Sequence, residues 1–204
     1  SVLLEIRKKF NGYVFLVDGF STDNTVNLAR KNGIDVFFRN NHGKGSAIQK
    51  ALEIANSKKI EYLLFFDCDQ TYSANDIEKF LFHLPSSDLV IGVRNLKSIK
   101  PFSRRLGNIV ATKLINLALK GNIKDSISGF KGIRVSSFYQ KIHENGFVAD
   151  ALICVIALNN KLKIEHVEIE YNERVGKSKM NLLIGLIELF KLLFSISKIL
   201  MKKL

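Results

Sequence analysis

Four short apolar segments alternate with helix-like segments over the first 92 residues of this chain. The predicted strands cover residues 13–17, 35–39, 62–66 and 88–92, and the predicted helices between them cover residues 23–31, 46–57 and 74–82. Strands that are apolar almost throughout, each followed by a helix, are typical of a parallel sheet with helices on both faces. The sequence therefore predicts an α/β fold built on a mostly parallel sheet.

The pattern is less regular after residue 92. A basic helix-like segment covers residues 103–120, a segment rich in glycine and serine reads DSISGFKGIR, and a helix over residues 149–159 precedes a strand over residues 163–171. Ser73, followed by Asp76 three residues later, predicts a capping box at the start of the third helix. No repeat, linker or low-complexity tract interrupts the chain, so we expect one domain over residues 1–180 and a C-terminal helix over residues 181–204.

A polar cluster follows each of the four predicted strands. In chain order the clusters read DGFSTDNT, NNHGKGSA, DCDQTYS and VRN. Ligands of parallel α/β sheets bind beyond the carboxyl ends of the strands. We therefore expect these clusters to meet at one edge of the sheet and to form a ligand site there.

Asp67 and Asp69 directly follow the apolar run YLLFF, in the segment FFDCDQT. The chain turns there, so both carboxylates can approach one cation, and Mg²⁺ or Mn²⁺ binds few carboxylates when phosphate oxygens complete its shell. The segment therefore predicts a site for such a cation and a diphosphate. It also matches the DxDxT signature of phosphatases with an aspartyl nucleophile, but no downstream acidic pair follows. A strand-ending turn with helix-capping acids would explain the segment without any ligand.

Two further segments supply candidate residues for a nucleotide. Asp18, at a strand end, could accept hydrogen bonds from a nucleobase or ribose, whereas Ser21 and Asp23 could equally cap the next helix. Gly43 lets the backbone approach an anion, Lys44 adds positive charge, and the helix that follows adds its N-terminal dipole. A tight turn explains the glycine equally well.

The charge balance is strongly basic, because 31 Lys and Arg against 19 Asp and Glu give a net charge of +12. Such a field favours anionic partners such as nucleotide phosphates or an acidic membrane surface. The basic residues gather at the loops described above and do not alternate with aromatic residues, so no nucleic-acid partner is expected. The two cysteines, Cys68 and Cys154, show neither disulfide nor metal spacing and indicate a reducing, cytoplasmic setting.

Taken together, the motifs resemble family 2 glycosyltransferases of the GT-A (Rossmann-like) fold, and among these the dolichyl-phosphate mannose or glucose synthases. They read VDGFSTDNT, NHGKGSA, FFDCDQTYSANDI, VIGVR, RRLGN, SGFKGIR and YNERVGKSKM. The resemblance implies an inverting transfer of a sugar from a GDP-mannose or UDP-glucose type donor to a polyprenyl or dolichyl phosphate, with Mg²⁺ or Mn²⁺ held by Asp67 and Asp69. The alternative that stays open is a soluble sugar or glycan acceptor, for which Asp150 would be the natural base.

The resemblance also assigns roles to single residues. It implies that Asp18 contacts the nucleoside and that Asp150 is an active-site acid. The residues that it places near phosphates, mainly on the acceptor side, are Arg94, Arg104 or Arg105, Arg174, Ser178 and Lys179. This chain departs from the family at Gly19, which replaces a second acid. The resemblance also implies that the chain starts after the family's first, central strand, so that it is either a fragment or has its start elsewhere. A missing central strand would expose sheet edges.

The C-terminal segment over residues 181–204 is apolar apart from a narrow polar stripe that contains Glu188 and Lys191. These two charges make it a poor candidate for crossing a bilayer. It is more typical of a helix that lies in the membrane interface with its lysines towards the headgroups. Packing against its own domain or a partner is the alternative. We therefore expect a peripheral protein on the cytosolic face of a membrane.

Overall fold

The computed structural model describes residues 2–142, 146, 148–172 and 182–201. The helices are α1 Val2–Lys9, α2 Thr25–Lys31, α3 Lys44–Ser57, α4 Ile77–His83, α5 Phe102–Leu119, α6 Val135–Phe138, α7 Ala149–Asn159 and α8 Leu182–Met201. The strands are β1 Phe15–Asp18, β2 Asp35–Phe38, β3 Tyr62–Phe65, β4 Leu89–Arg94, β5 Lys131–Arg134 and β6 Ile164–Ile169. Short 3₁₀ turns cover Ala74–Asp76, Leu84–Ser86 and Leu96–Ser98.

The larger sheet has the strand order β3-β5-β4-β6. β4 and β6 pair in parallel, whereas β5 runs antiparallel to both of its neighbours. β3, β4 and β6 therefore share one direction, and β5 is the exception in a sheet that the sequence predicts to be mostly parallel. β1 and β2 form a separate parallel pair.

Helix α3 connects the two sheets. Phe15 and Val17 of β1 pack against the same core cluster that contains Leu63 of β3 and Leu52 of α3. Among the described residues, β1 and β2 are both end strands of their pair, and β3 and β6 are the end strands of the larger sheet. The exposure of sheet edges by a missing central strand stays a prediction.

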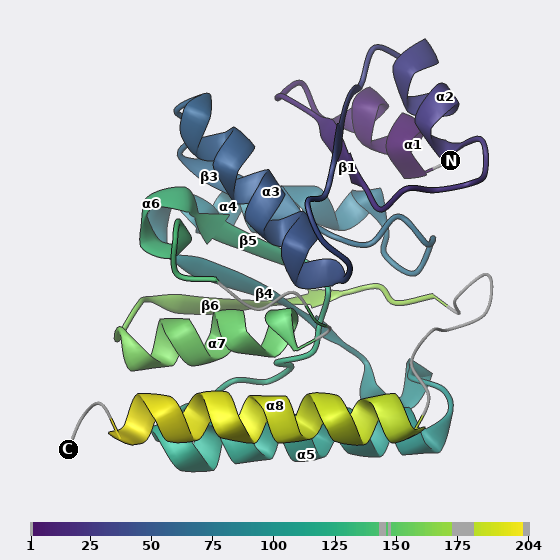
Figure 1. Ribbon diagram of the computed structural model, residues 1–204. Helices are drawn as coiled ribbons and strands as arrows, with labels where there is room; N and C mark the ends of the chain where they lie inside the picture. Colours follow the sequence, from purple (N-terminus) through teal and green to yellow (C-terminus); the bar gives the residue numbers. More distant parts are fainter. Residues whose placement is uncertain (1, 143–145, 147, 173–181, 202–204) are drawn as a thin grey trace.

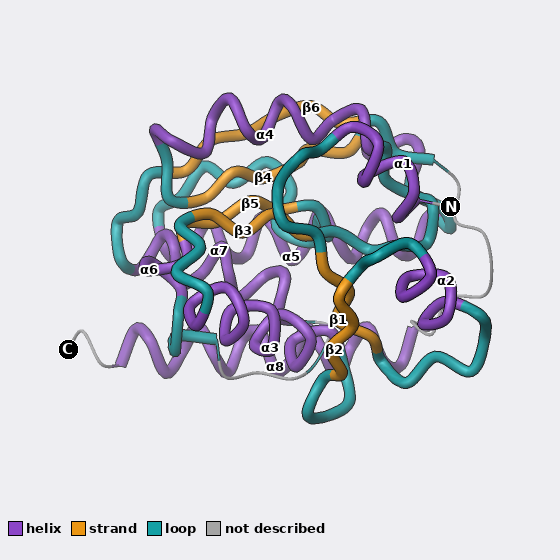
Figure 2. The backbone as a smooth tube through the Cα atoms, turned by 90° about the horizontal axis from the view of Figure 1, so that it is seen from above, coloured by secondary structure: helices purple, strands orange, loops and turns teal. Residues whose placement is uncertain are grey.

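The core consists of stacked layers (Figures 1 and 2). Alternate residues of β4 point to opposite faces, as the pleat requires: Leu89 and Ile91 pack on the cluster with α3 and α7, and Val90 packs on the cluster with α1 and α4. Helices α5 and α8 lie side by side against the outer side of α7 and share a third cluster with it. The sheet is thus covered on both faces, as predicted.

The structure confirms the predicted strands and helices to within a few residues at each end, but two local predictions were wrong. The glycine-rich segment DSISGFKGIR contains β5, which the sequence analysis left without an element. The capping box forms only in part: Ser73 accepts a hydrogen bond from the backbone N–H of Asn75. The carboxylate of Asp76 instead accepts from the backbone N–H of Glu170, which ties α4 to the segment after β6.

Candidate active site

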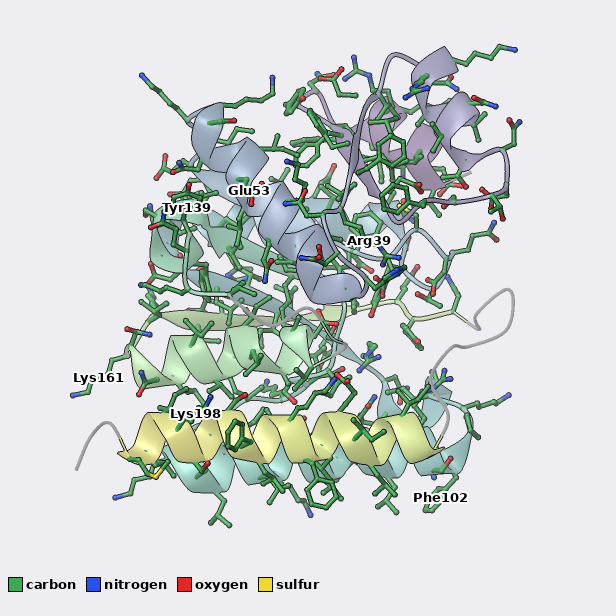
Figure 3. The ribbon with its side chains drawn as sticks, in the orientation of Figure 1. Arg39, Glu53, Phe102, Tyr139, Lys161 and Lys198 are labelled. Carbon is green, nitrogen blue, oxygen red and sulfur yellow. The ribbon has the colours of Figure 1, made fainter. Side chains whose placement is uncertain are left out.

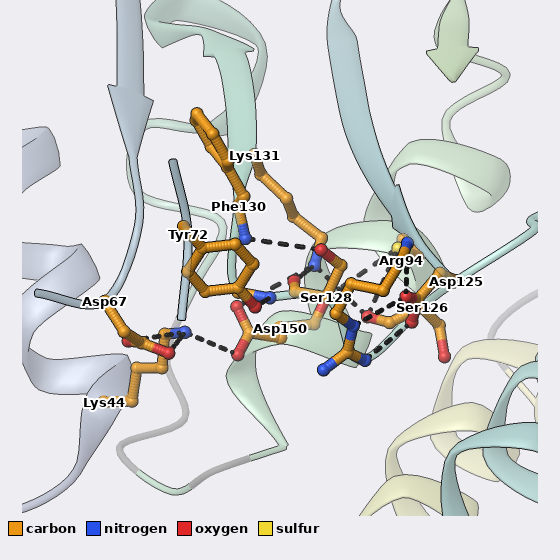
Figure 4. Close-up of polar contacts among 12 residues, drawn as sticks. Lys44, Asp67, Tyr72, Arg94, Asp125, Ser126, Ser128, Phe130, Lys131 and Asp150 are labelled. Atoms are coloured by element: carbon orange, nitrogen blue, oxygen red, sulfur yellow. Dashed lines mark hydrogen bonds and ion pairs between the residues drawn. The ribbon is translucent and has the colours of Figure 1, made fainter. Parts of the chain in front are cut away.

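Lys44 lies at the centre of a charged cluster beyond the carboxyl end of β3 (Figure 4). Its Nζ is 3.0 Å from Oδ1 and 3.1 Å from Oδ2 of Asp67, and 2.9 Å from Oδ2 of Asp150. Burial alone would lower the pKa of Lys44, but the carboxylates of Asp150 and Asp67 outweigh it and raise this pKa. The lysine is therefore a firmly held cation between two acids that the sequence placed 83 residues apart.

Asp150 is buried at the start of α7 and faces a second lysine. Nζ of the fully buried Lys131 lies 3.8 Å from Oδ1 of Asp150 and donates hydrogen bonds to the carbonyl oxygens of Ser126 and Ser128. Oδ1 of Asp150 is itself buried without a hydrogen-bond partner among the described residues. Two ammonium groups, those of Lys44 and Lys131, therefore lie beside the carboxylate of Asp150.

Asp69 is held by the turn that follows the strand. Its Oδ1 accepts hydrogen bonds from the backbone N–H and the hydroxyl of Thr71, at 3.3 and 2.5 Å. Cys68 between the two acids is exposed. The predicted pairing of Asp67 and Asp69 within one turn is consistent with this geometry, although Lys44 is the contact of Asp67 that the structure shows.

The two carboxylates fit a hard divalent cation by donor type, because Mg²⁺ and Mn²⁺ prefer oxygen ligands and accept one or two carboxylates together with substrate phosphates. The Asp67 side chain is 38% exposed, so a ligand can reach it. Within the described part of the chain, no group of three or more His, Cys, Asp or Glu residues is arranged to hold a metal ion. A cation here would therefore need oxygens from its substrate.

Gly129 and Tyr72 close one side of the cluster. The hydroxyl of Tyr72 accepts a hydrogen bond of 2.8 Å from the backbone N–H of Gly129. A Cβ atom at Gly129 would lie 2.6 Å from Nζ of Lys44 and 2.7 Å from Oδ2 of Asp67. Only glycine leaves room for this arrangement. Gly129, Tyr72 and Lys131 were not predicted as site residues from the sequence. Gly129 and Lys131 lie in the motif SGFKG, which was the only local indication of either residue.

Arg94 is buried and fully engaged with an acid that the sequence analysis did not select. Its Nε and Nη2 donate to Oδ2 and Oδ1 of Asp125 at 2.8 and 2.9 Å, a bidentate pair. Burial alone would lower the pKa of Arg94, but Asp125 raises it. The guanidinium also lies over the ring of Tyr171, at 5.2 Å from the centroid. In this arrangement Arg94 is bound to Asp125 and packed on Tyr171. Its predicted contact with a phosphate stays a prediction.

The predicted nucleotide residues lie at the ends of β1 and β2 and at the start of α3. Buried Asp18 accepts from the backbone N–H and the hydroxyl of Ser21, at 2.7 and 2.6 Å. Exposed Asp23 accepts from the backbone N–H of Thr25 at the start of α2, and hydrogen bonding from Thr25, first from its side chain and then from its backbone, lowers the pKa of Asp23. Gly43 has a φ of 99° and directly precedes α3. Asp23 therefore contacts the start of α2, whereas Ser21 closes the turn at Asp18 and does not cap that helix. The predicted contacts of both residues with a nucleotide stay predictions.

Arg39 joins these loops. Its guanidinium donates to the carbonyl oxygens of Gly19 and Gly43, at 3.1 and 3.4 Å, and it lies beside the N-terminal end of α3 (Figure 3). A Cβ atom at Gly19 would meet this guanidinium at 3.0 Å. The absence of a side chain at Gly19 therefore makes room for the guanidinium of Arg39.

The acceptor-side arginines are only partly described. Arg104 and Arg105 lie in the first turn of α5, where Arg105 packs over the ring of Phe102, 4.9 Å from its centroid. Arg174, Ser178 and Lys179 lie outside the described residues. The structure therefore brings together Lys44, Asp67 and Asp150, and places Arg104 and Arg105 on a separate helix.

A family model described as glycosyl transferase family 2 matches residues 4–140 of the chain. The chain belongs to this family. The resemblance seen in the sequence motifs is thereby confirmed, and family membership removes the phosphatase interpretation of FFDCDQT.

Proteins of known name support the same branch of the family. A dolichyl-phosphate hexose transferase of Haloferax volcanii is 30% identical over 187 residues, which cover 89% of this chain and 80% of that protein. Glycosyltransferase AglJ of the same organism is also 30% identical over 187 residues, but the match covers 61% of its length. A dolichyl-phosphate beta-glucosyltransferase of Saccharomyces cerevisiae is 26% identical, and the match covers 62% of its length. The chain thus spans about three fifths of the length of two of these relatives.

Solved structures confirm the GT-A fold. Glucosyl-3-phosphoglycerate synthase from Mycobacterium tuberculosis, crystallised with Mn²⁺, UDP and glucosyl-3-phosphoglycerate, superposes with a TM-score of 0.78. The match covers 96% of this chain and 73% of the synthase at 16% identity. At that identity the likeness concerns the fold alone.

Proposed function

We propose that this protein transfers a hexose from a nucleoside diphosphate sugar, of the GDP-mannose or UDP-glucose type, to a polyprenyl or dolichyl phosphate. The observation that carries the proposal is the cluster in which Lys44 lies between Asp67 and Asp150, with Asp69 in the same turn as Asp67. It stands beyond the carboxyl end of β3, where α/β folds bind their ligands. Relatives named for transfer to dolichyl phosphate support the acceptor class.

Asp67 and Asp69 are the residues that would hold Mg²⁺ or Mn²⁺ together with the donor diphosphate. The cation would neutralise the negative charge that develops on the departing nucleoside diphosphate. Lys44, a cation beside Asp67 whose side chain is 15% exposed, adds fixed positive charge at the same place. A solved structure of the same fold contains Mn²⁺ and UDP, which is consistent with this donor class.

The chemistry of a phosphate acceptor fits the acids at the site. A phosphate oxygen is already anionic at neutral pH, so it can attack the anomeric carbon without first losing a proton to a base. The new bond forms between that oxygen and the anomeric carbon, and the bond from this carbon to the diphosphate oxygen breaks, with its electron pair leaving on the nucleoside diphosphate. Asp150, whose carboxylate lies beside the ammonium groups of Lys44 and Lys131, is the acid that we expect to orient a hydroxyl of the donor sugar.

A lipid acceptor requires a membrane-facing surface, and α5 and α8 provide a candidate. Glu188 of α8 turns inward and accepts from the backbone N–H of Val148, while Leu192 and Ile196 are buried against the domain. Large apolar side chains remain exposed on the two helices: Phe102, Leu106, Val110 and Leu117 on α5, and Leu186, Ile187, Phe190, Leu193, Phe194, Leu200 and Met201 on α8. Helix α8 therefore packs on the domain with one side and exposes apolar side chains on another.

We propose that this surface docks the protein peripherally on the cytosolic face of a membrane. Such a helix pair can enter the headgroup region without crossing the bilayer, while the net charge of +12 favours anionic lipids. Among the described helices, none has the length and apolarity needed for a membrane span.

The test supplies radiolabelled UDP-glucose or GDP-mannose, dolichyl phosphate in vesicles and Mg²⁺ or Mn²⁺. The proposal predicts label in an organic-extractable product, and a loss of at least about a hundredfold in Asp69→Asn. Label that remains in an aqueous product when soluble sugars are supplied would favour the soluble-acceptor alternative. No transfer from either donor to either acceptor would contradict the proposal.

A further inference from the structure

Two phenylalanines form an exposed aromatic pair at the ends of β1 and β2. The rings of Phe20 and Phe38 are stacked, with centroids 5.3 Å apart and an interplanar angle of 14°. Phe20 is 60% exposed and Phe38 is 38% exposed. Phe38 pairs in register with Asp18, and Phe20 follows Asp18 by two residues, so the pair adjoins the predicted nucleoside acid.

The backbone holds Phe20 in an unfavourable conformation. Its φ is 67°, in the left-handed region that bulky side chains rarely adopt. The two hydrogen bonds from Ser21 to the carboxylate of Asp18 close a tight turn, and Phe20 lies at its tip. A glycine would satisfy this turn without strain, so the large exposed ring needs another reason for its presence.

Hydrogen bonds of Arg39 link the loop of Phe20 to the loop of Lys44 in the charged cluster. Gly19, adjacent to Phe20, is bonded through its carbonyl to Arg39, and Arg39 reaches the carbonyl of Gly43. Gly43 precedes Lys44, which contacts Asp67. A chain of hydrogen bonds and sequence neighbours thus runs from the aromatic pair to the proposed diphosphate site.

We propose that Phe20 and Phe38 form the stacking platform for the nucleobase of the donor. In a nucleoside diphosphate sugar the base lies at the end of the molecule away from the reacting sugar, with the diphosphate between them. A ligand whose diphosphate lies at Asp67 can therefore direct its base along Lys44, Gly43 and Arg39 towards β1 and β2. Aromatic faces stack on every base, so this platform supplies affinity, while the hydrogen-bonding groups around it select the base. The inference rests on the proposed donor class.

The experiment measures calorimetric affinities for UDP, GDP and inorganic pyrophosphate, each with Mg²⁺, in the full chain. Phe20→Gly and Phe38→Thr should weaken binding of whichever nucleotide the unaltered protein prefers by about tenfold. Their affinity for pyrophosphate should stay the same, because it has no base. Phe38→Tyr keeps the flat ring and should bind as the unaltered protein does.

The control is Lys59→Gly, because exposed Lys59 also has a positive φ, of 56°, but lies after α3 and away from the site. It should leave all three affinities unchanged. Phe20→Gly removes the strain of the positive φ, and this gain offsets the loss of the few contacts that the mostly exposed ring makes. Its melting temperature should therefore fall by no more than about 2 °C. That readout separates a lost platform from a lost fold.

The outcomes are distinguishable. If the unaltered protein binds UDP or GDP and Phe20→Gly binds it equally well, the platform is refuted and the proposed function stands. An equal loss of nucleotide and pyrophosphate affinity would also refute the platform, since it would indicate a disturbed phosphate site. If the unaltered protein binds neither nucleotide, the proposed donor class fails, and the platform fails with it.

Discussion

At the residue scale, Gly129 offers a direct test of the packing around Lys44. Any side chain at this position would displace the ammonium of Lys44 or the carboxylate of Asp67, which lie 2.6 and 2.7 Å from where its Cβ would be. We predict that Gly129→Ala lowers nucleotide-sugar turnover at least about tenfold, because misplacing catalytic groups by about an ångström is costly. Steady-state transfer rates measure the effect.

Gly107→Ala is the matched control. Nothing lies within 4 Å of a Cβ built at Gly107, which is in α5. This change should leave turnover unaltered and raise the free energy of unfolding by about 0.5–1 kcal/mol, since alanine is favoured over glycine in helices. Equal turnover in the two variants would show that Gly129 does not constrain the cluster.

Lys131 is predicted to stabilise the fold as well as the site. It is fully buried, pairs with Asp150 and satisfies two backbone carbonyl groups. Lys131→Met leaves these groups unpaired and should lower the free energy of unfolding by about 3–5 kcal/mol. Urea denaturation provides the measurement.

Lys50→Met is the control, because it removes an exposed pair with Glu53. It should change the free energy of unfolding by no more than about 0.5 kcal/mol. A similar loss of stability in both variants would refute the role of Lys131.

The residues of the site differ in how well the sequence predicts them. Asp67 and Lys44 follow strands, so the rule that ligands bind beyond strand ends selects both. Lys131 lies inside a strand and Asp125 lies in a loop 31 residues after Arg94. Nothing local marks either residue, because only the folded chain brings each one to its partner.

At the scale of elements, Asp88 joins three strands. It precedes β4, its carboxylate accepts from the hydroxyl of Ser137 and the backbone N–H of Lys163, and it lies 3.5 Å from Nε of Arg134 in β5. Burial alone would raise the pKa of Asp88, but these hydrogen bonds, first that of Lys163, lower it below its usual value. The ionised form is therefore the stabilising one.

The sign of the pH dependence follows. A lowered pKa in the folded state contributes stability above the unfolded value near 3.8, and this contribution is lost as the pH falls further. Asp88→Asn should cost about 1.5–3 kcal/mol at pH 7 and should lose less stability than the unaltered protein between pH 5 and pH 3. Melting curves across this range test it. Exposed Glu78→Gln should keep the original profile; an Asp88→Asn profile parallel to the original would contradict the assignment.

Strand β5 could not be predicted from the pattern of apolar residues. Its four residues, Lys131–Arg134, contain a lysine, a glycine and an arginine, and alternation of apolar residues cannot be seen in so short a run. Its strand conformation comes from its neighbours β3 and β4, which pair with it on both sides. Longer and more apolar β4 needed no such context to be predicted.

At the scale of the whole molecule, the side formed by α5 and α8 is predicted to bind membranes. Phe190 and Phe194 are 72% and 60% exposed and lie one turn apart on α8. Changing both to Asp removes apolar area and adds negative charge, so binding to vesicles with anionic lipids should weaken at least about tenfold. Sedimentation with the vesicles measures this binding.

Phe82→Asp is the control for that surface. Phe82 is 81% exposed but belongs to α4, on another side of the domain. It should leave vesicle binding within about twofold, since the lost area and the added charge lie away from the lipid. If the α8 variant and the Phe82 variant sediment alike, docking through α5 and α8 is refuted.

The separation of the strands into two sheets also belongs to this scale. Each βα unit could be predicted from its local pattern. The placement of β1 and β2 relative to the larger sheet depends on α3, whose residues contact both groups of strands. Such long-range packing leaves no local signal in the sequence.

The central claim is that Asp67 and Asp69 bind a divalent cation together with a nucleoside diphosphate sugar. The most direct measurement is a thermal-shift screen of UDP-glucose and GDP-mannose, each with and without Mn²⁺, on the unaltered protein and on Asp69→Asn. We predict that one donor raises the melting temperature only when Mn²⁺ is present, and that Asp69→Asn abolishes this rise. A rise that is the same without the cation, or that persists in Asp69→Asn, would contradict the claim.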